Sequence, residues 1–390
     1  MIKYTLRRIL QAIPTFFGIT LFSYLLMTAA PGGPEAALTF DPRITPQQRE
    51  REAARLGVND PFIVQYLRWL TGNDWMRWDT DGGTPTILGL EGTPVSNTLT
   101  TRDLPDGIAD GSVLIPLGLD ANGDGDYDDP GDQIYPPGNR YGIIRGDFGR
   151  SFFYNRPVMS MIGERVAATL ELGIAALVTG LIIGVPVGIL AAVRRGGWFD
   201  NLTRILAVIF NAIPIFWLAL ILILIFGARL GWLPMAGRTP RVLEGGIPPI
   251  YERIQYLILP TFVLATGAIA VYSRYMRASM LDVISQDYMR TAKSKGLASR
   301  AVWFRHGARN ALIPLATFLG PAITSLLSGA AITETVFGWP GLGRFGVEAV
   351  TAQDFPVVMA VVIIGAVATL LGYMLSDVMY ALIDPRIRFD

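Results

Sequence analysis

Long apolar runs separated by polar connections dominate the hydrophobic pattern of this chain. A helix needs about 20 mainly apolar residues to cross the hydrocarbon core of a membrane. Runs of this kind predict six transmembrane helices, at residues 9–29, 167–193, 206–226, 257–271 with its flanks, 312–332 and 357–383. The pattern therefore indicates an all-α membrane protein.

The first run has two interpretations. Lys3, Arg7 and Arg8 precede it and small residues end it at Ala29 and Ala30, an order also typical of a cleaved secretory signal. The run is, however, longer than the apolar part of most signals and long enough to span a bilayer. We therefore favour an uncleaved first helix.

Two residue types within the spans bear on helix packing. Gly180, Gly184 and Gly188 recur every fourth residue in the second span, which predicts a small-residue face for close contact with another helix. Prolines inside spans either form kinks or reflect ordinary usage in membrane helices. They are Pro14, Pro186, Pro214 and Pro321.

Charge patterning orients the spans. Residues 31–165 carry more acids than bases, whereas cations gather at 3–8, 194–204, 274–309 and 386–388. Because Lys and Arg favour cytoplasmic loops, residues 31–165 are expected outside and both termini in the cytoplasm. We therefore divide the chain into an N-terminal stub with the first helix (1–30), an extracytoplasmic region (31–165) and a five-helix core (166–390).

Composition supports the membrane assignment and narrows the chemistry. The 390 residues are 51% apolar and only 17% charged, against about a quarter charged in soluble domains. The chain has no cysteine and one histidine, which excludes thiolate chemistry and argues against histidine-based zinc or triad sites. No GxxxxGK[ST] phosphate loop occurs, so we expect no ATPase site and no catalytic residues in this chain.

The extracytoplasmic region contains an unusual segment. Between about 73 and 143 the sequence becomes rich in Gly, Asp, Pro and Thr, which predicts an inserted β-rich or irregular subdomain. Within it, the sequence DANGDGDYDDPGD follows the spacing of a calcium-binding loop, although a glycine occupies the place of the final glutamate. The alternative is a solvated acidic turn. The candidate calcium ligands are Asp120, Asn122, Asp124, Asp126, Asp128 and Asp132.

The connection between the fourth and fifth spans, residues 274–314, is strongly basic and is called here the basic connection. Its pattern predicts two helices separated by a break at Gly296 and Leu297. Cations alone are explained by the general positive charge of cytoplasmic loops. The motifs QDYMRTAKSKGL (286–297) and RHGARNALIP (305–314) are more specific.

These two motifs resemble the cytoplasmic loop of ABC importer permeases, and most closely the dipeptide/oligopeptide permease family. Further motifs of that family follow in order along the chain. They are APGGP (30–34), VQYLRWL (64–70), RGDFGRSF (from Arg145), TLELG (169–173), IPIFW (213–217), ETVFGWPGLGR (334–344), DFPVV (354–358) and DPRIR (384–388). Two departures are Arg290 where the general loop pattern has a glutamate, and the insertion at 73–143, which the ordinary family member lacks.

The resemblance implies a type I ABC importer permease fold and a set of partners. These are a second permease, two ATP-binding subunits and an extracytoplasmic binding protein, in a bacterial or archaeal cell membrane. A short helix around 293–299 is expected to dock on an ATPase, with Gly296 allowing a sharp turn and Ala292 allowing close approach. The expected coupling residues are Ala292, Lys293, Lys295, Gly296, Leu297, Arg305, His306, Asn310 and Pro314.

The segment 334–344 is expected at the outer mouth of the transport pathway. Its candidate residues are Glu334, Trp339, Pro340, Gly341 and Gly343. Glu334 and Asp377 are ionisable residues near membrane depth, which favours a functional role. Each is equally well explained as a helix cap or a partner of a neighbouring subunit.

The substrate implied by the resemblance is a di- or oligopeptide, with nickel or oligosaccharides as alternatives. One histidine and no cysteine make a metal relay less favoured. A different class of function is a membrane-anchored hydrolase that uses acids of the outer region, but those acids lie in a Gly/Asp turn and not in a cleft. No cofactor is expected in the chain apart from the candidate calcium, with ATP bound by partner subunits.

Overall fold

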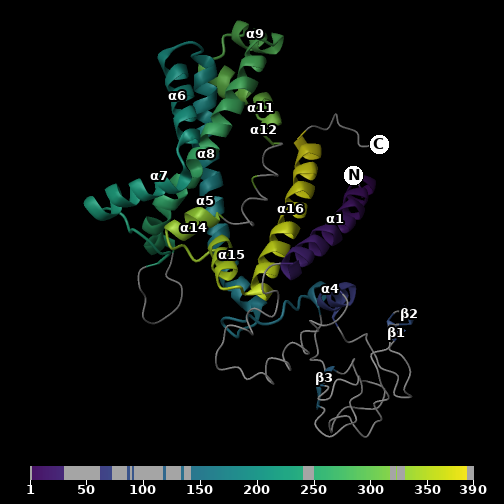
Figure 1. Ribbon diagram of the computed structural model, residues 1–390. Coiled ribbons are helices and arrows are strands. Elements are labelled where there is room, and N and C mark those ends of the chain that lie inside the picture. The colour runs from purple at the N-terminus through teal and green to yellow at the C-terminus, as the bar shows by residue number, and fades with distance from the viewer. Residues whose placement is uncertain are drawn as a thin grey trace. The chain divides into compact units, whose positions relative to one another are not determined.

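Helices make up most of the part of the chain that the computed structural model describes (Figure 1). The described residues are 2–29, 62–72, 86–87, 90–91, 117–119, 133–135, 142–239, 250–316, 322 and 330–383. The chain forms two compact units. One comprises Met1–Phe17, Ile162–Glu348 and Val361–Asp390, and the other comprises Gly18–Met161 and Ala349–Ala360.

Four helices are long and apolar enough to cross a membrane. They are α1 (Ile2–Ala29), α5 (Val158–Val193), α8 (Ile250–Ile284) and α16 (Phe355–Ile383). They correspond to the first, second, fourth and sixth predicted spans. α5 and α8 begin earlier than predicted, because polar residues at their ends continue the helix beyond the apolar run. The chain is therefore a multi-pass membrane protein.

The predicted third span, 206–226, is not one straight helix. The segment forms α6 (Trp198–Ala212), α7 (Ile215–Leu222) and the π-helix η2 (Ile223–Arg229), and the two halves meet at 100°. Ile213 at the corner has an extended backbone, with φ −75° and ψ 125°. Proline disfavours a helical conformation in the residue before it, so Pro214 explains the break.

The predicted fifth span falls largely outside the described residues. At its two ends the structure has α12 (Ile313–Ala316) and α14 (Ala331–Val336). Among the described residues, the number of spans is four, or up to five if the bent pair counts as one. The full count of six stays a prediction.

The small-residue face of α5 packs against α8, as predicted. A methyl group added at Gly180 would lie 2.7 Å from Ala268 Cβ, and one at Gly188 would lie 2.5 Å from the Ser273 carbonyl oxygen. A methyl group at Gly184 would lie 3.0 Å from Tyr272 Cβ and 3.2 Å from the Ile269 carbonyl oxygen. Small residues thus let the two backbones approach closely, which is the main source of attraction between helices in lipid.

The remaining elements of the first unit connect the long helices. After α8 come α9 (Asp287–Ser294), α10 (Ser299–Ala301), the π-helix η3 (Val302–Gly307) and α11 (Ala308–Ala311). In Figure 1, α9 lies beyond the ends of α6 and α8. The helix α15 (Leu342–Thr351) follows α14 through a tight turn.

The second unit has its own small core. Tyr24 of α1 packs against Tyr66 and Leu70 of α4 (Phe62–Thr71), and Thr20 and Tyr66 share a buried hydrogen bond of 2.9 Å between their hydroxyl oxygens. Ser151 and Phe152 follow the 3₁₀ turn η1 (Ile143–Arg145). The Ser151 hydroxyl and the Phe152 backbone N–H donate hydrogen bonds to the buried carboxylate of Asp354. Two of the motifs found in the sequence, RGDFGRSF and DFPVV, are therefore joined.

Short strands occur in the predicted insertion. β1 (Thr86–Ile87) pairs antiparallel with β2 (Leu90–Glu91), and β3 (Leu117–Leu119) pairs antiparallel with β4 (Gln133–Tyr135). The limits of this subdomain and of the other predicted domains stay predictions.

The contact between α5 and α8 leads to a first prediction. Gly188→Ala should lower the free energy of unfolding by about 1–3 kcal/mol, because the added methyl group overlaps backbone atoms of α8. The midpoint of thermal unfolding in lipid–detergent micelles measures this change. Gly163→Ala in the same helix is the control, since a methyl group there has nothing within 4 Å and should be neutral or stabilising. Equal effects at the two glycines would contradict the close packing.

Candidate functional site

The basic connection begins as the end of α8, up to Ile284, and then forms a helix–turn–helix from Asp287 to Ala311. α9 begins after Gln286, whose backbone is extended, and Asp287 lies in its first turn, where a carboxylate is favoured by the helix dipole. Lys293 lies in its last turn, where a cation is favoured. The short helix therefore occupies Asp287–Ser294, earlier than the expected 293–299, because the chain already turns at Lys295 and Gly296.

Gly296 makes the turn that was predicted from the sequence. Its φ is +72°, a left-handed conformation that costs other residues free energy. Its N–H donates to the Lys293 carbonyl over 3.0 Å, which closes the end of α9. A side chain at Gly296 would meet no other atom of the described chain within 4 Å, so the backbone angle, and not lack of space, requires glycine.

The two arms of the helix–turn–helix pack against each other. Met289 and Ala292, on one face of α9, contact Val302 in a buried apolar cluster. The Lys293 ammonium lies 4.5 Å from the centre of the Trp303 ring, an attractive cation–π contact between the arms. The two arms and the turn between them are thus held together as one packed unit.

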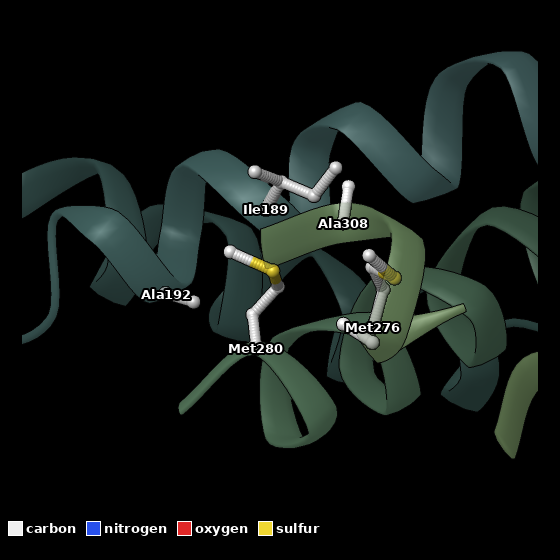
Figure 2. Close-up of a cluster of buried hydrophobic side chains, with 6 residues drawn as sticks. Ile189, Ala192, Met276, Met280 and Ala308 are labelled. Atoms are coloured by element: carbon white, nitrogen blue, oxygen red, sulfur yellow. The ribbon is translucent and has the colours of Figure 1, made fainter. Parts of the chain in front are cut away.

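The second arm returns to the membrane helices through an apolar cluster, shown in Figure 2. Ala308 and Ala311 of α11 pack against side chains of α5 and α8 in what we call the methionine–alanine cluster. Its members are Ile189, Ala192, Met276, Met280, Ala308 and Ala311. Because tightly packed interiors transmit strain, a displacement of the basic connection is passed directly to α5 and α8.

Most of the expected coupling residues lie on the surface of the basic connection. They are Lys293, Lys295, Gly296, Leu297, Arg305, His306, Asn310 and Pro314. Ala292 is different, because only 7% of it is exposed and its methyl group faces the arm that follows. Ala292 therefore helps hold the two arms together, and its expected close contact with a partner stays a prediction.

The segment 334–344 forms a hairpin built around a buried carboxylate. Glu334, only 1% exposed, accepts hydrogen bonds from the Arg344 N–H (2.8 Å), the Ala330 N–H (3.2 Å) and the Thr169 hydroxyl (3.2 Å). Thr169 also accepts the Leu342 N–H over 2.7 Å. The alternative in which Glu334 caps a helix therefore describes its contacts best, because it binds the N–H that precedes α14.

The other residues expected at the outer mouth complete this hairpin. Trp339 is fully buried and donates from its ring N–H to the Ala168 carbonyl over 2.8 Å. Methyl groups at Gly341 and Gly343 would lie 2.4 Å and 3.0 Å from the Glu334 carboxylate, so glycine makes room for it. Pro340 is exposed at the turn. Whether the hairpin borders the pathway stays a prediction.

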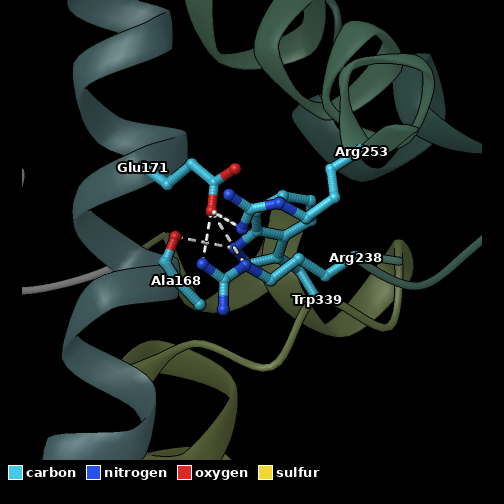
Figure 3. Close-up of polar contacts among 5 residues, drawn as sticks. All are labelled: Ala168, Glu171, Arg238, Arg253 and Trp339. Atoms are coloured by element: carbon cyan, nitrogen blue, oxygen red, sulfur yellow. Dashed lines mark hydrogen bonds and ion pairs between the residues drawn. The ribbon is translucent and has the colours of Figure 1, made fainter. Parts of the chain in front are cut away.

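A charged cluster that the sequence did not reveal lies beside this hairpin, as Figure 3 shows. Glu171 of α5 accepts hydrogen bonds from Arg238 Nε (2.8 Å) and Arg253 Nη1 (3.0 Å). The two arginines are 67 and 82 residues away from it along the chain. Glu171 stands within the TLELG motif, but nothing local indicated its partners.

Some candidate residues cannot be placed. The calcium candidates Asp120, Asn122, Asp124, Asp126, Asp128 and Asp132 and the motifs APGGP and DPRIR lie outside the described residues, and so does the side chain of Asp377. Within the described parts of the chain, no group of three or more His, Cys, Asp or Glu side chains comes together. The calcium loop stays a prediction.

Comparison with protein families gives two matches. A family model described as "Binding-protein-dependent transport system inner membrane component" matches residues 184–389, which include the whole basic connection and the hairpin. A second, described as its N-terminal counterpart, "Binding-prot-dependent transport system membrane comp, N-term", matches residues 1–83.

Curated relatives match over the full chain. Oligopeptide transport system permease protein AppB of Bacillus subtilis (strain 168) is 35% identical over 390 residues, covering 100% of both chains. Dipeptide transport system permease protein DppB of Escherichia coli (strain K12) is 30% identical and covers 100% of this chain and 99% of DppB. A solved structure of the MetNI methionine ABC transporter resembles 58% of this chain more loosely, at 19% identity and a TM-score of 0.44.

The buried carboxylate leads to a second prediction. Glu334→Ala should lower the free energy of unfolding by about 2 kcal/mol or more, because three donors lose their buried acceptor. Glu348→Ala is the control, since that carboxylate is partly exposed and forms one i,i+4 pair with Arg344. Thermal unfolding of both purified variants measures the difference. A Glu334 variant as stable as the Glu348 variant would show that the carboxylate does not hold the hairpin.

Proposed function

Because the chain belongs to the family of binding-protein-dependent transport system inner membrane components, we propose that it is the permease subunit of an ATP-driven importer of di- and oligopeptides. The observation that carries the proposal is similarity along the whole chain to permeases of oligopeptide and dipeptide transport systems, at 35% and 30% identity. Similarity over complete chains includes both the membrane helices and the basic connection.

The proposed assembly contains subunits that this chain does not supply. Two ATP-binding subunits, a second permease and an extracytoplasmic binding protein would complete it, with substrate passing between the two permeases. This chain then has no ATPase site of its own, and both its termini lie in the cytoplasm. The absence of a phosphate-loop motif from the sequence supports this division of labour.

The geometry supports a mechanical role for the basic connection. In the proposed complex an ATPase subunit binds the exposed surface of the turn around Gly296 and moves it when the nucleotide sites close. The methionine–alanine cluster passes that movement to α5 and α8. Packed helices change between discrete arrangements, so the movement shifts the balance between inward and outward access to the pathway.

Peptide is the proposed cargo, and the alternatives are nickel and oligosaccharides. A relative named as a glutathione transport system permease, GsiC of Escherichia coli O1:K1 / APEC, is 31% identical over 389 residues. Together with AppB and DppB it supports small peptides as the substrate class. A nickel pathway usually offers histidine or cysteine ligands, and this chain has one histidine and no cysteine.

The turn at Gly296 provides the test. Gly296→Val in the complete complex should reduce ATP-driven peptide uptake at least about tenfold, because a β-branched residue resists a positive φ and distorts the docking turn. Gly296→Asn should retain most uptake, since asparagine tolerates this conformation. Uptake of a labelled tripeptide into proteoliposomes and co-purification of the ATPase are measured together.

A matched control separates backbone strain from loss of coupling. Gly231 also has a positive φ, +64°, and no atom within 4 Å of an added methyl group, but it lies outside the basic connection. Gly231→Val should leave uptake near the wild-type level. Normal uptake and normal ATPase attachment in the Gly296→Val variant would refute the coupling role. Peptide-independent hydrolytic activity of the purified chain alone would favour the membrane-anchored hydrolase.

A further inference from the structure

A cavity of about 680 Å³ lies among α5, α6 and α8, and it runs along α6 from Thr203 to Ala212. Three arginines line it: Arg204 on α6, and Arg274 and Arg277 on α8. Asn211 adds a polar side chain, and Ala207 and Val208 add apolar surface. The cavity is much larger than one water molecule needs.

The charge of this cavity is not balanced by the part of the chain that the structure describes. Arg277 is neutralised by Asp200, which is 1% exposed and accepts hydrogen bonds from Arg277 Nε (2.6 Å) and Nη2 (2.7 Å). Arg204 and Arg274 form no ion pair with a described carboxylate and are both exposed. Two guanidinium groups therefore remain available to a ligand on the walls of one cavity.

The surface next to the cavity is apolar. On α6, Ile205, Val208 and Ile209 are exposed, and Val208 has 68% of its surface uncovered. These residues follow one another along the helix that carries Arg204. A ligand that suits both features has an anionic head and an apolar tail.

We propose that this cavity binds the phosphate headgroup of an anionic phospholipid through Arg204 and Arg274, with an acyl chain along the exposed face of α6. Guanidinium groups bind phosphate oxygens through paired hydrogen bonds, and basic pockets between transmembrane helices are suited to anionic headgroups. A free anion would use the arginines but would have no need of the apolar face. The lipid is therefore the ligand that uses the whole surface.

A lipid bound at this site lies next to the methionine–alanine cluster. Arg274 and Arg277 flank Met276, a member of the methionine–alanine cluster, on the same turns of α8. A headgroup held between Arg204 and Arg274 fixes the spacing of α6 and α8 beside the contact that joins α8 to the basic connection.

Native mass spectrometry of the complete transporter, titrated with phosphatidylglycerol, tests the proposal. The Arg204→Gln/Arg274→Gln double variant should bind roughly tenfold less phosphatidylglycerol than the wild type at equal lipid concentration. The Arg194→Gln/Arg195→Gln double variant is the matched control, because it removes the same two charges from the turn before α6 without lining the cavity, and it should bind normally. Unchanged binding in the double variant, or an equal loss in the control, would overturn the proposal.

Competition distinguishes the possible sources of the anion. Phosphatidylcholine, inorganic phosphate and an acidic tripeptide should each fail to displace phosphatidylglycerol. Displacement by phosphate would assign the cavity to a free anion, and displacement by the peptide would assign it to the transport pathway, and either result would overturn the lipid site.

A measurement on the wild type keeps the test decisive if the double variant does not fold. Hydrogen exchange of residues 203–212 and 273–277 should be slower in nanodiscs containing phosphatidylglycerol than in nanodiscs of phosphatidylcholine alone. Equal exchange in the two membranes would overturn the proposal.

Discussion

The contact on which this permease depends is the methionine–alanine cluster that joins α11 to α5 and α8. It includes small and flexible side chains: Ala308 and Ala311 come from α11, and Met276 and Met280 come from α8. Alanines let the helices approach closely, and methionines fill irregular space between them. Without this contact the helix–turn–helix would be an appendage of the membrane helices instead of a part of their packing.

A second constraint is the cost of burying polar groups in a membrane-spanning unit. The chain meets it by giving buried carboxylates several donors each. Glu334 receives two backbone N–H groups and a hydroxyl, and Asp200 receives a guanidinium and the N–H of Gly196. Glycine at 341 follows from the same need, because a methyl group there would lie 2.4 Å from the Glu334 carboxylate carbon.

Sequence reasoning succeeded where the signal is local. The glycine repeat of α5 and the turn at Gly296 are each visible in a few consecutive residues, and the structure confirms both. It was less successful where a residue's surroundings depend on residues far away in the sequence. The burial of Ala292 depends on Val302 in the following arm, and the partners of Glu171 lie in other parts of the chain. The sharp bend at Pro214 was visible as a proline, but its angle depends on how α7 packs.

The bend between α6 and α7 separates two kinds of helix in this protein. α5 and α8 continue as single helices for 36 and 35 residues, through Pro186 and Pro260 respectively. A push along α6, by contrast, stops at the corner, because force along one axis has almost no component along another at 100° to it. α7 is instead coupled sideways to α8, because its Leu218 and Ala219 pack against Leu259 and Val263 of that helix, so movement reaches α7 from α8 and not along α6.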